Sequence, residues 1–237
     1  MTTTTNTPTR PIQIPNLLLF SFSLLLGLIS GSLLLAAGWY LTQTPLGAQL
    51  INWLGITDKT PWYFSRASGT VAYLLLAGST IWGLLLSSKI IKETVPAALS
   101  LAMHNILSWL AIALTSWHTL ALLFDNYYTY TLADLTIPFI GPYRPGWVGL
   151  GIMGFYLMLL TSLSFYFRKQ MGQKRWRQLH YATFVAYILA TVHGLMAGTD
   201  SSQPGMRVLY VGSGLLVFFL TNYRLLMGKT SPARQQR

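Results

Sequence analysis

Six long stretches of apolar residues restrict what this chain can fold into. They cover roughly residues 16–42, 67–88, 99–124, 147–167, 178–198 and 207–227. A bilayer core about 30 Å thick is crossed by about 20 apolar residues in a helix, so each stretch is long enough, or nearly so, to span it. With 52% hydrophobic and only 9% charged residues, the composition disfavours a soluble domain. We therefore expect an all-α integral membrane protein with a six-helix transmembrane bundle over residues 16–227.

The two ends of the sequence are polar and of low complexity. Residues 1–15 include a threonine run and a single charge, and residues 228–237 end in glutamine and arginine, so we expect a disordered N-terminus and a disordered tail. The stretch 16–42 is longer than the apolar part of a signal peptide, which favours a retained helix. A cleaved signal peptide is the alternative.

Positive charges are distributed unevenly among the connections. The chain carries a net charge of +11, which in a soluble protein would suggest nucleic acid binding. Here the basic residues concentrate in alternate connections and in the tail, as the positive-inside rule describes, so we expect no nucleic acid partner. The richest connection, 168–177, contains Arg168, Lys169, Lys174, Arg175 and Arg177. The sequence thus predicts a multi-pass protein of the cell membrane with both termini in the cytoplasm.

All four histidines of the chain lie in two of the apolar stretches. His104 and His118 are 14 residues apart in the third stretch, and His180 and His193 are 13 apart in the fifth. Imidazole is costly in hydrocarbon without a partner, which makes each of them a candidate functional residue. The predicted orientation places His104 level with His180 near the cytoplasm and His118 level with His193 near the outer face. At 1.5 Å per residue the two levels are about 20 Å apart, which fits two stacked haems between the third and fifth helices.

The chemistry of the available ligands favours haem over other metal groups. The chain has no cysteine, which excludes thiolate ligands, iron–sulfur clusters and covalently attached haem. No acidic residue lies within the histidine-bearing stretches to complete a closed zinc site. Histidines 14 apart share a helix face within about 40°, whereas 13 residues leave His180 and His193 about 140° apart on an ideal helix. The fifth helix therefore needs a bend or overwinding, for which Gly194 and Gly198 are candidate positions.

Several segments give the chain a resemblance to a known family. They are "RASGTVAYLLL" (66–76), "SWHTLALLFDNY" (116–127), "PYRPGWVGLG" (142–151) and "LHYATFVAYILATVHG" (179–194). Together with the histidine spacings, they resemble the ferric reductase-like transmembrane domain, a six-helix core shared by ferric reductases, NADPH oxidases and the haem subunit of the periplasmic methionine sulfoxide reductase system. The resemblance covers roughly residues 65–227.

This resemblance implies two b-type haems and electron transfer across the membrane. Carried over residue by residue, His104 and His180 would ligate the iron of the inner haem, and His118 and His193 that of the outer one. Ferric reductases and NADPH oxidases continue into a flavin and nicotinamide domain, whereas this sequence has no G-x-G-x-x-G fingerprint after its sixth helix. We therefore expect an electron-transfer oxidoreductase component, a stand-alone bacterial member, that depends on a cytoplasmic flavoprotein or a membrane quinol as donor. The acceptor would be an extracytoplasmic protein or a small oxidant.

Arginines near the membrane faces are candidate partners for the haem propionates, because guanidinium forms paired hydrogen bonds with carboxylates. The candidates are Arg175 and Arg177 for the inner haem, and Arg66 and Arg144 for the outer haem. They also fit the positive-inside bias or snorkelling, so these assignments stay open. The alternative to a cytochrome is a haem-free permease or assembly protein whose histidines hydrogen-bond between helices or relay protons.

Overall fold

The computed structural model describes residues 16–88, 90–91 and 94–230. Across these ranges the chain is helical, without a β-strand. The predicted disorder of residues 1–15 and of most of the tail lies outside the described residues. The helices are α1 (Asn16–Thr42), α2 (Pro45–Trp53), α3 (Thr60–Ser88), α4 (Ala97–Ala121), the 3-10 turn η1 (Leu122–Phe124), α5 (Leu132–Thr136), α6 (Pro145–Ser164), α7 (Arg168–Met171), α8 (Gln173–His180), α9 (Ala182–Ala197) and α10 (Pro204–Thr230).

The expected number of membrane spans is confirmed by length and composition. Six segments of the described chain are long and apolar enough to cross a membrane: α1, α3, α4, α6, α8 together with α9, and α10. Several bounds differ from the prediction, including the start of the fifth span, which lies at Gln173 rather than near residue 178. The second span begins at Thr60 rather than near residue 67, and α10 continues to Thr230, into residues assigned to the tail.

The chain divides into two compact units, residues 1–57 and 58–237. The first contains α1 and α2; Thr44 caps α2, where its hydroxyl accepts a hydrogen bond from the backbone of Gly47. The second contains the other five candidate spans and all four histidines.

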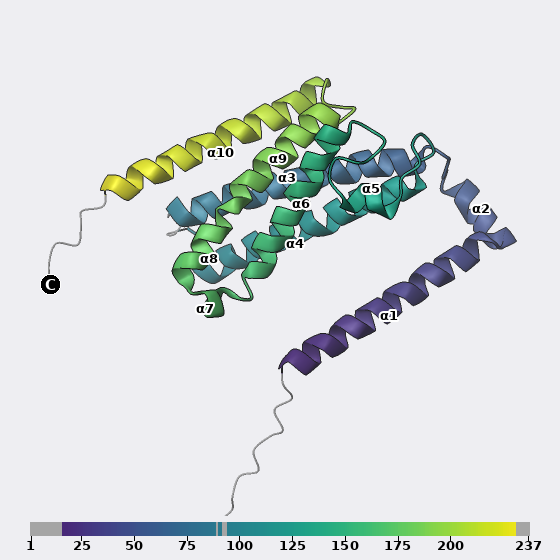
Figure 1. Ribbon diagram of the computed structural model, residues 1–237, viewed down its shortest axis with the longest axis horizontal. Helices are drawn as coiled ribbons and strands as arrows, with labels where there is room; N and C mark the ends of the chain where they lie inside the picture. Colours follow the sequence, from purple (N-terminus) through teal and green to yellow (C-terminus); the bar gives the residue numbers. More distant parts are fainter. Residues whose placement is uncertain (1–15, 89, 92–93, 231–237) are drawn as a thin grey trace, which may run out of the picture. The chain divides into compact units, whose positions relative to one another are not determined.

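The second unit is built from closely packed helix pairs. α3 packs along α4, α6 packs along α9, and α10 packs against α3. Figure 1 shows α7 and α8 at one end of this unit and α5 at the other. The histidine-bearing elements, α4 and the α8–α9 segment, are therefore packed against different neighbours, α3 and α6.

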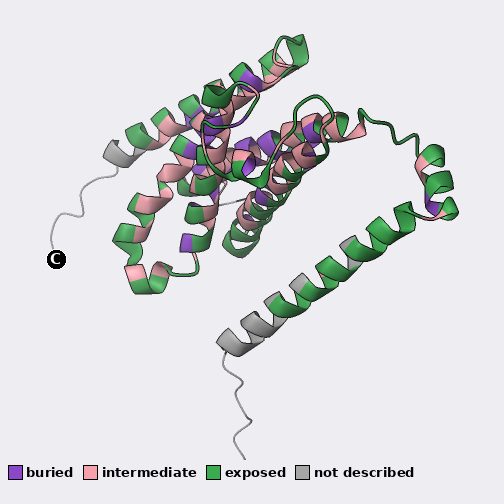
Figure 2. Ribbon diagram, turned by 45° about the vertical axis from the view of Figure 1, so that its right-hand side comes forward, coloured by how far each residue is buried: buried purple, intermediate pink, exposed green. Residues whose placement is uncertain are grey.

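Small residues allow this close packing, and large apolar residues cover the outside. Ala77, Ala111 and Ala186 are buried at helix contacts, while Leu215, Phe218 and Phe219 of α10 are exposed. Figure 2 shows buried and intermediate residues where the helices of the second unit face one another and exposed residues on their outward sides. In a soluble protein the large apolar residues would be inside. Large apolar residues on the outside are expected for helices solvated by lipid, and small residues between the helices let the backbones approach closely.

A buried polar cluster joins three helices in the middle of the second unit. The Tyr73 hydroxyl of α3 lies 3.2 Å from that of Tyr187 and 3.1 Å from that of Thr191, both on α9, and 2.9 Å from the Ser213 hydroxyl of α10. Each of these hydroxyls thus has a hydrogen-bond partner inside the helix bundle. Such a network orients α9 and α10 against α3.

Candidate haem-binding histidine pairs

The structure brings the four histidines together as the two pairs that the sequence predicts. The ring centroids of His104 and His180, here the inner pair, lie 6.1 Å apart. Those of His118 and His193, the outer pair, lie 6.3 Å apart. Each pair joins one residue of α4 to one residue of the α8–α9 segment. The names inner and outer follow the predicted orientation.

This separation matches the geometry of two axial imidazoles on one metal ion. An imidazole nitrogen binds a metal at about 2 Å and lies about 1 Å from its own ring centre, so two opposed rings have centres about 6 Å apart. Both pairs therefore have a spacing that is compatible with a metal ion between the two rings.

α3 holds both histidines of α4 by the same hydrogen bond. Nδ1 of His104 lies 3.0 Å from the backbone carbonyl oxygen of Ser79, and Nδ1 of His118 lies 2.8 Å from that of Ser65. Because a carbonyl oxygen only accepts, each Nδ1 carries the hydrogen, and the lone pair of the neutral ring is on Nε2. Nε2 is then the atom free to bind a metal, as in sites where a carbonyl orients the ligating histidine.

A glycine one turn after each of these serines makes room for the imidazole ring. A Cβ atom on Gly69 would lie 2.8 Å from Nδ1 of His118, and one on Gly83 would lie 3.1 Å from Cε1 of His104. α3 thus carries two serine–glycine units with a four-residue step, 65–69 and 79–83, spaced 14 residues apart like the histidines they hold.

α6 supplies the same arrangement to His193 of α9. Nδ1 of His193 lies 3.0 Å from the carbonyl oxygen of Trp147, and a Cβ on Gly151, four residues later, would lie 2.8 Å from that nitrogen. Three of the four histidines are therefore oriented by a carbonyl and a glycine on a neighbouring helix. The same combination of a carbonyl and a glycine occurs on both α3 and α6, which indicates that the orientation of these rings matters.

His180 is held differently. Its Nδ1 is buried without a hydrogen-bond partner in the described structure. The ring instead stacks on Trp176, one turn earlier, with centroids 5.1 Å apart and planes 22° from parallel. α6 ends at Ser164, and the side chain after it, Phe165, packs against Trp176. Aromatic stacking thus replaces the carbonyl and the glycine at this position.

The helix that carries His180 and His193 is interrupted between the two histidines. α8 ends at His180 and α9 begins at Ala182, with Tyr181 between them. The Tyr181 amide lies 3.3 Å from the carbonyl oxygens of both Arg177 and Gln178, a tightened turn that shifts the helical phase. The break is not at Gly194 or Gly198: Gly194 packs on the ring of Tyr210, and Gly198 caps α9.

A cavity of about 400 Å³ surrounds the inner pair. This volume is within the range of small-molecule and cofactor sites. Its wall is mostly apolar and includes His104, His180 and Gly83. Two cations, Arg177 of α8 and Arg224 of α10, also line it, and none of its described lining residues is acidic. The cavity suits a flat apolar ligand with an anionic edge.

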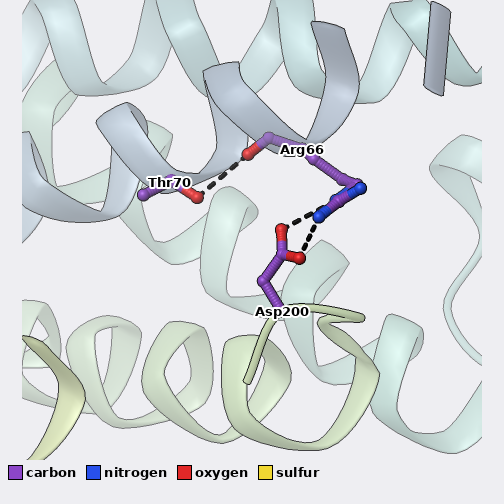
Figure 3. Close-up of polar contacts among 3 residues, drawn as sticks. All are labelled: Arg66, Thr70 and Asp200. Carbon is purple, nitrogen blue, oxygen red and sulfur yellow. Dashed lines mark hydrogen bonds and ion pairs between the residues drawn. The ribbon is translucent and has the colours of Figure 1, made fainter. Parts of the chain in front are cut away.

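The predicted arginines have different surroundings. Arg175 and Arg177 are both exposed, but only Arg177 is among the residues that line the cavity. Arg66 forms an ion pair with Asp200, with Nε 2.7 Å from one carboxylate oxygen and a second contact from Nη2 to the other (Figure 3). Its guanidinium also lies over the ring of Trp62, 4.1 Å from the centroid.

Arg144 begins α6 in a left-handed conformation, with φ 40°. Its guanidinium donates to the carbonyl oxygen of Met196, and the hydroxyl of Tyr143 donates to that of Ala197 at 3.1 Å. These are unsatisfied carbonyls at the end of α9, just after His193. Arg144 therefore fastens the 125–144 loop to the helix that carries an outer-pair histidine.

We expect the Arg66–Asp200 pair to stabilise the contact between α3 and the loop before α10. The side chains are only 30% and 27% exposed. A double-mutant cycle of Arg66→Gln and Asp200→Asn, measured by thermal unfolding in detergent, should give a coupling of about 1 kcal/mol. Arg207→Gln, which removes an exposed cation at the same end, is the control. Coupling near zero would show that the pair contributes nothing to stability.

The 125–144 loop is ordered by local contacts. Thr131 and Asp134 form a reciprocal capping box at the start of α5, and the Thr131 hydrogen bonds hold the pKa of Asp134 below its usual value. Burial, together with the charge of Asp125, raises the pKa of Tyr130 to about 12. Tyr130 is therefore a neutral phenol, and Asp134 a carboxylate, throughout the physiological pH range.

The comparisons with known proteins give no relative. No protein-family model, no curated protein and no solved structure matches the chain. Within the described residues, no group of three or more histidine, cysteine or acidic side chains gathers as a metal site. The described histidines form pairs, and a haem iron with two axial protein ligands needs two histidines.

Proposed function

We propose that the protein is a dihaem b-type cytochrome that carries electrons across the membrane, from a donor on the cytoplasmic side to an extracytoplasmic acceptor. The observation that carries this proposal is the repeated ring separation of 6.1 and 6.3 Å between histidines of opposite helices. The Nδ1–carbonyl contacts of His104, His118 and His193 add to it, because they leave Nε2 of each with its lone pair.

In this proposal each bound haem b supplies a one-electron ferric–ferrous couple. The chain's own residues do the rest. The histidine pairs ligate the two irons, α3 and α6 fix the ring orientations, and the apolar helices keep water away. Arg177 and Arg224 line the inner cavity, where they would neutralise propionates.

The donor and the acceptor belong to the proposal. The resemblance to the ferric reductase-like family supports a cytoplasmic flavoprotein or a membrane quinol as donor, and a protein or a small oxidant as acceptor. The ordered 125–144 loop is fastened to α9 next to the outer pair, so it is the first surface on which to look for acceptor contacts.

Haem content tests the proposal directly. We expect the chain, expressed with sufficient haem and purified in detergent, to contain two b-type haems by pyridine haemochrome. Its dithionite-reduced minus oxidised spectrum should show b-type bands. One haem per chain would leave one histidine pair without its assigned role. Colourless protein would refute the cytochrome and favour the haem-free membrane protein, with histidines that only hydrogen-bond between helices.

A further inference from the structure

The inner and outer histidine pairs differ in the hydrogen bonds made by Nδ1. Both outer rings, His118 and His193, donate to backbone carbonyls. In the inner pair only His104 does so, and Nδ1 of His180 is buried without a partner in the described structure. A hydrogen bond from Nδ1 makes an imidazole a more basic ligand. A more basic ligand stabilises ferric over ferrous iron.

The charges near the two pairs differ in the same direction. Arg177 and Arg224 line the inner cavity without an acidic residue among its described lining. At the outer end, the positive charge of Arg66 is neutralised by Asp200, and the other cation, Arg144, is exposed and donates to the carbonyl oxygen of Met196. Cations that no protein carboxylate neutralises offset the negative charge of the propionates, and they thereby favour the reduced iron, which carries one positive charge less.

The charges of the whole sequence also differ between the inner and the outer side. In the predicted orientation, the outer connections hold four basic residues, Lys59, Arg66, Arg144 and Arg207, and four acidic ones, Asp58, Asp125, Asp134 and Asp200. The outer side is therefore neutral, and the entire net charge of +11 is on the inner side. Salt screens most of these exposed charges, so Arg224, which is half-buried in the cavity wall, matters most.

We infer that the residues around the inner pair set a higher reduction potential there than the residues around the outer pair set at theirs. This inference rests on the proposed function, because it concerns the haems that the two pairs would hold. It assigns a role to the unpartnered Nδ1 of His180, and it gives Arg177 and Arg224 a second role beside propionate binding.

Spectroelectrochemical titration of the purified haem-loaded protein tests the inference without any activity assay. We expect two one-electron waves. Removing the outer haem with His118→Ala should keep the wave of higher potential, and removing the inner haem with His104→Ala should keep the lower one. Arg224→Gln should lower only the higher wave, by about tenfold in the reduction equilibrium, which is about 59 mV.

Lys169→Gln, which removes an exposed cation of α7 outside the cavity wall, is the matched control and should leave both waves in place. The Arg224→Gln comparison uses the protein with both haems, so it holds even if the histidine variants fail to fold. Retention of the lower wave in His118→Ala would overturn the inference, as would equal shifts in Arg224→Gln and Lys169→Gln. Protein without haem would instead refute the proposed function.

Discussion

Replacing His118 by alanine is expected to remove one of the two haems and to leave the other with an unchanged spectrum. The physical reason is the separation of the histidines into two levels, with each ring about 6 Å from its partner on the other helix. His193→Ala should give the same result, because it removes the opposite ligand of the same iron. The measurement is haem per chain by pyridine haemochrome, with the reduced minus oxidised spectrum of what remains.

Double variants test the pairing of the histidines, and they do not require that each haem spectrum be assigned to the inner or the outer pair. His118→Ala combined with His193→Ala should lose one haem, no more than either single variant, because both changes affect one level. His118→Ala combined with His104→Ala should lose both. Leu120→Ala, an exposed position on α4 close to His118, is the control and should keep both haems. Loss of both haems in the double variant of His118 and His193 would contradict the pairing.

Alanine at the glycines behind the imidazole rings is expected to weaken haem retention in graded steps. A new Cβ would lie 2.8 Å from Nδ1 of His118 in Gly69→Ala, and 2.8 Å from Nδ1 of His193 in Gly151→Ala. Both distances are too short for a real contact, so the ring must turn and lose its carbonyl. Outer-shell changes of this kind cost about 10–100-fold in metal-site affinity. Gly83→Ala, at 3.1 Å from His104, should have a smaller effect.

Gly78→Ala gives this series an internal control. Gly78 is on the same helix, between the two serine–glycine units, and a Cβ there would meet only a methyl group of Leu107 at 4.0 Å. It should keep both haems and stabilise α3 by up to about 1 kcal/mol, because alanine is the better helix former. Haem retention after dilution into haem-binding apoprotein measures the series. Equal retention in Gly69→Ala and Gly78→Ala would show that the glycines are not needed for ring placement.

The sequence predicted the parts of the architecture that follow from hydropathy and from helix periodicity. Apolar length alone located the six candidate spans, and the positions of His104, His118, His180 and His193 predicted which rings meet. Both inferences use properties that a helix imposes over many residues, the rise per residue and the length that crosses a bilayer. Neither requires knowledge of how the helices pack side by side.

The features that sequence reasoning missed all depend on contacts between helices. Ser65 and Ser79 approach Nδ1 of the α4 histidines with their backbone carbonyls and, at 3.1 and 3.2 Å, with their hydroxyls. A single serine in an apolar helix does not reveal such a contact, and Arg224 belongs to a basic segment like several others. The equal spacing of the serine–glycine units and of the α4 histidines was the one signal that would have revealed α3 as the supporting helix. Asp200 as the partner of Arg66 lies 134 residues away along the chain, and only the fold shows it.

The equal spacing on α3 and α4 has a further consequence for how such a chain can change. Ser65 lies opposite His118, and Ser79 lies opposite His104. The distance between the two histidine levels is therefore set by a 14-residue spacing on each of the two antiparallel helices. One residue inserted into either helix between the levels would rotate one site by about 100° and move it by about 1.5 Å relative to its support. Only matched insertions in α3, α4 and their counterparts would preserve both sites. The distance between the levels is therefore a property of the helix pairs together, and no single helix can lengthen or shorten it alone.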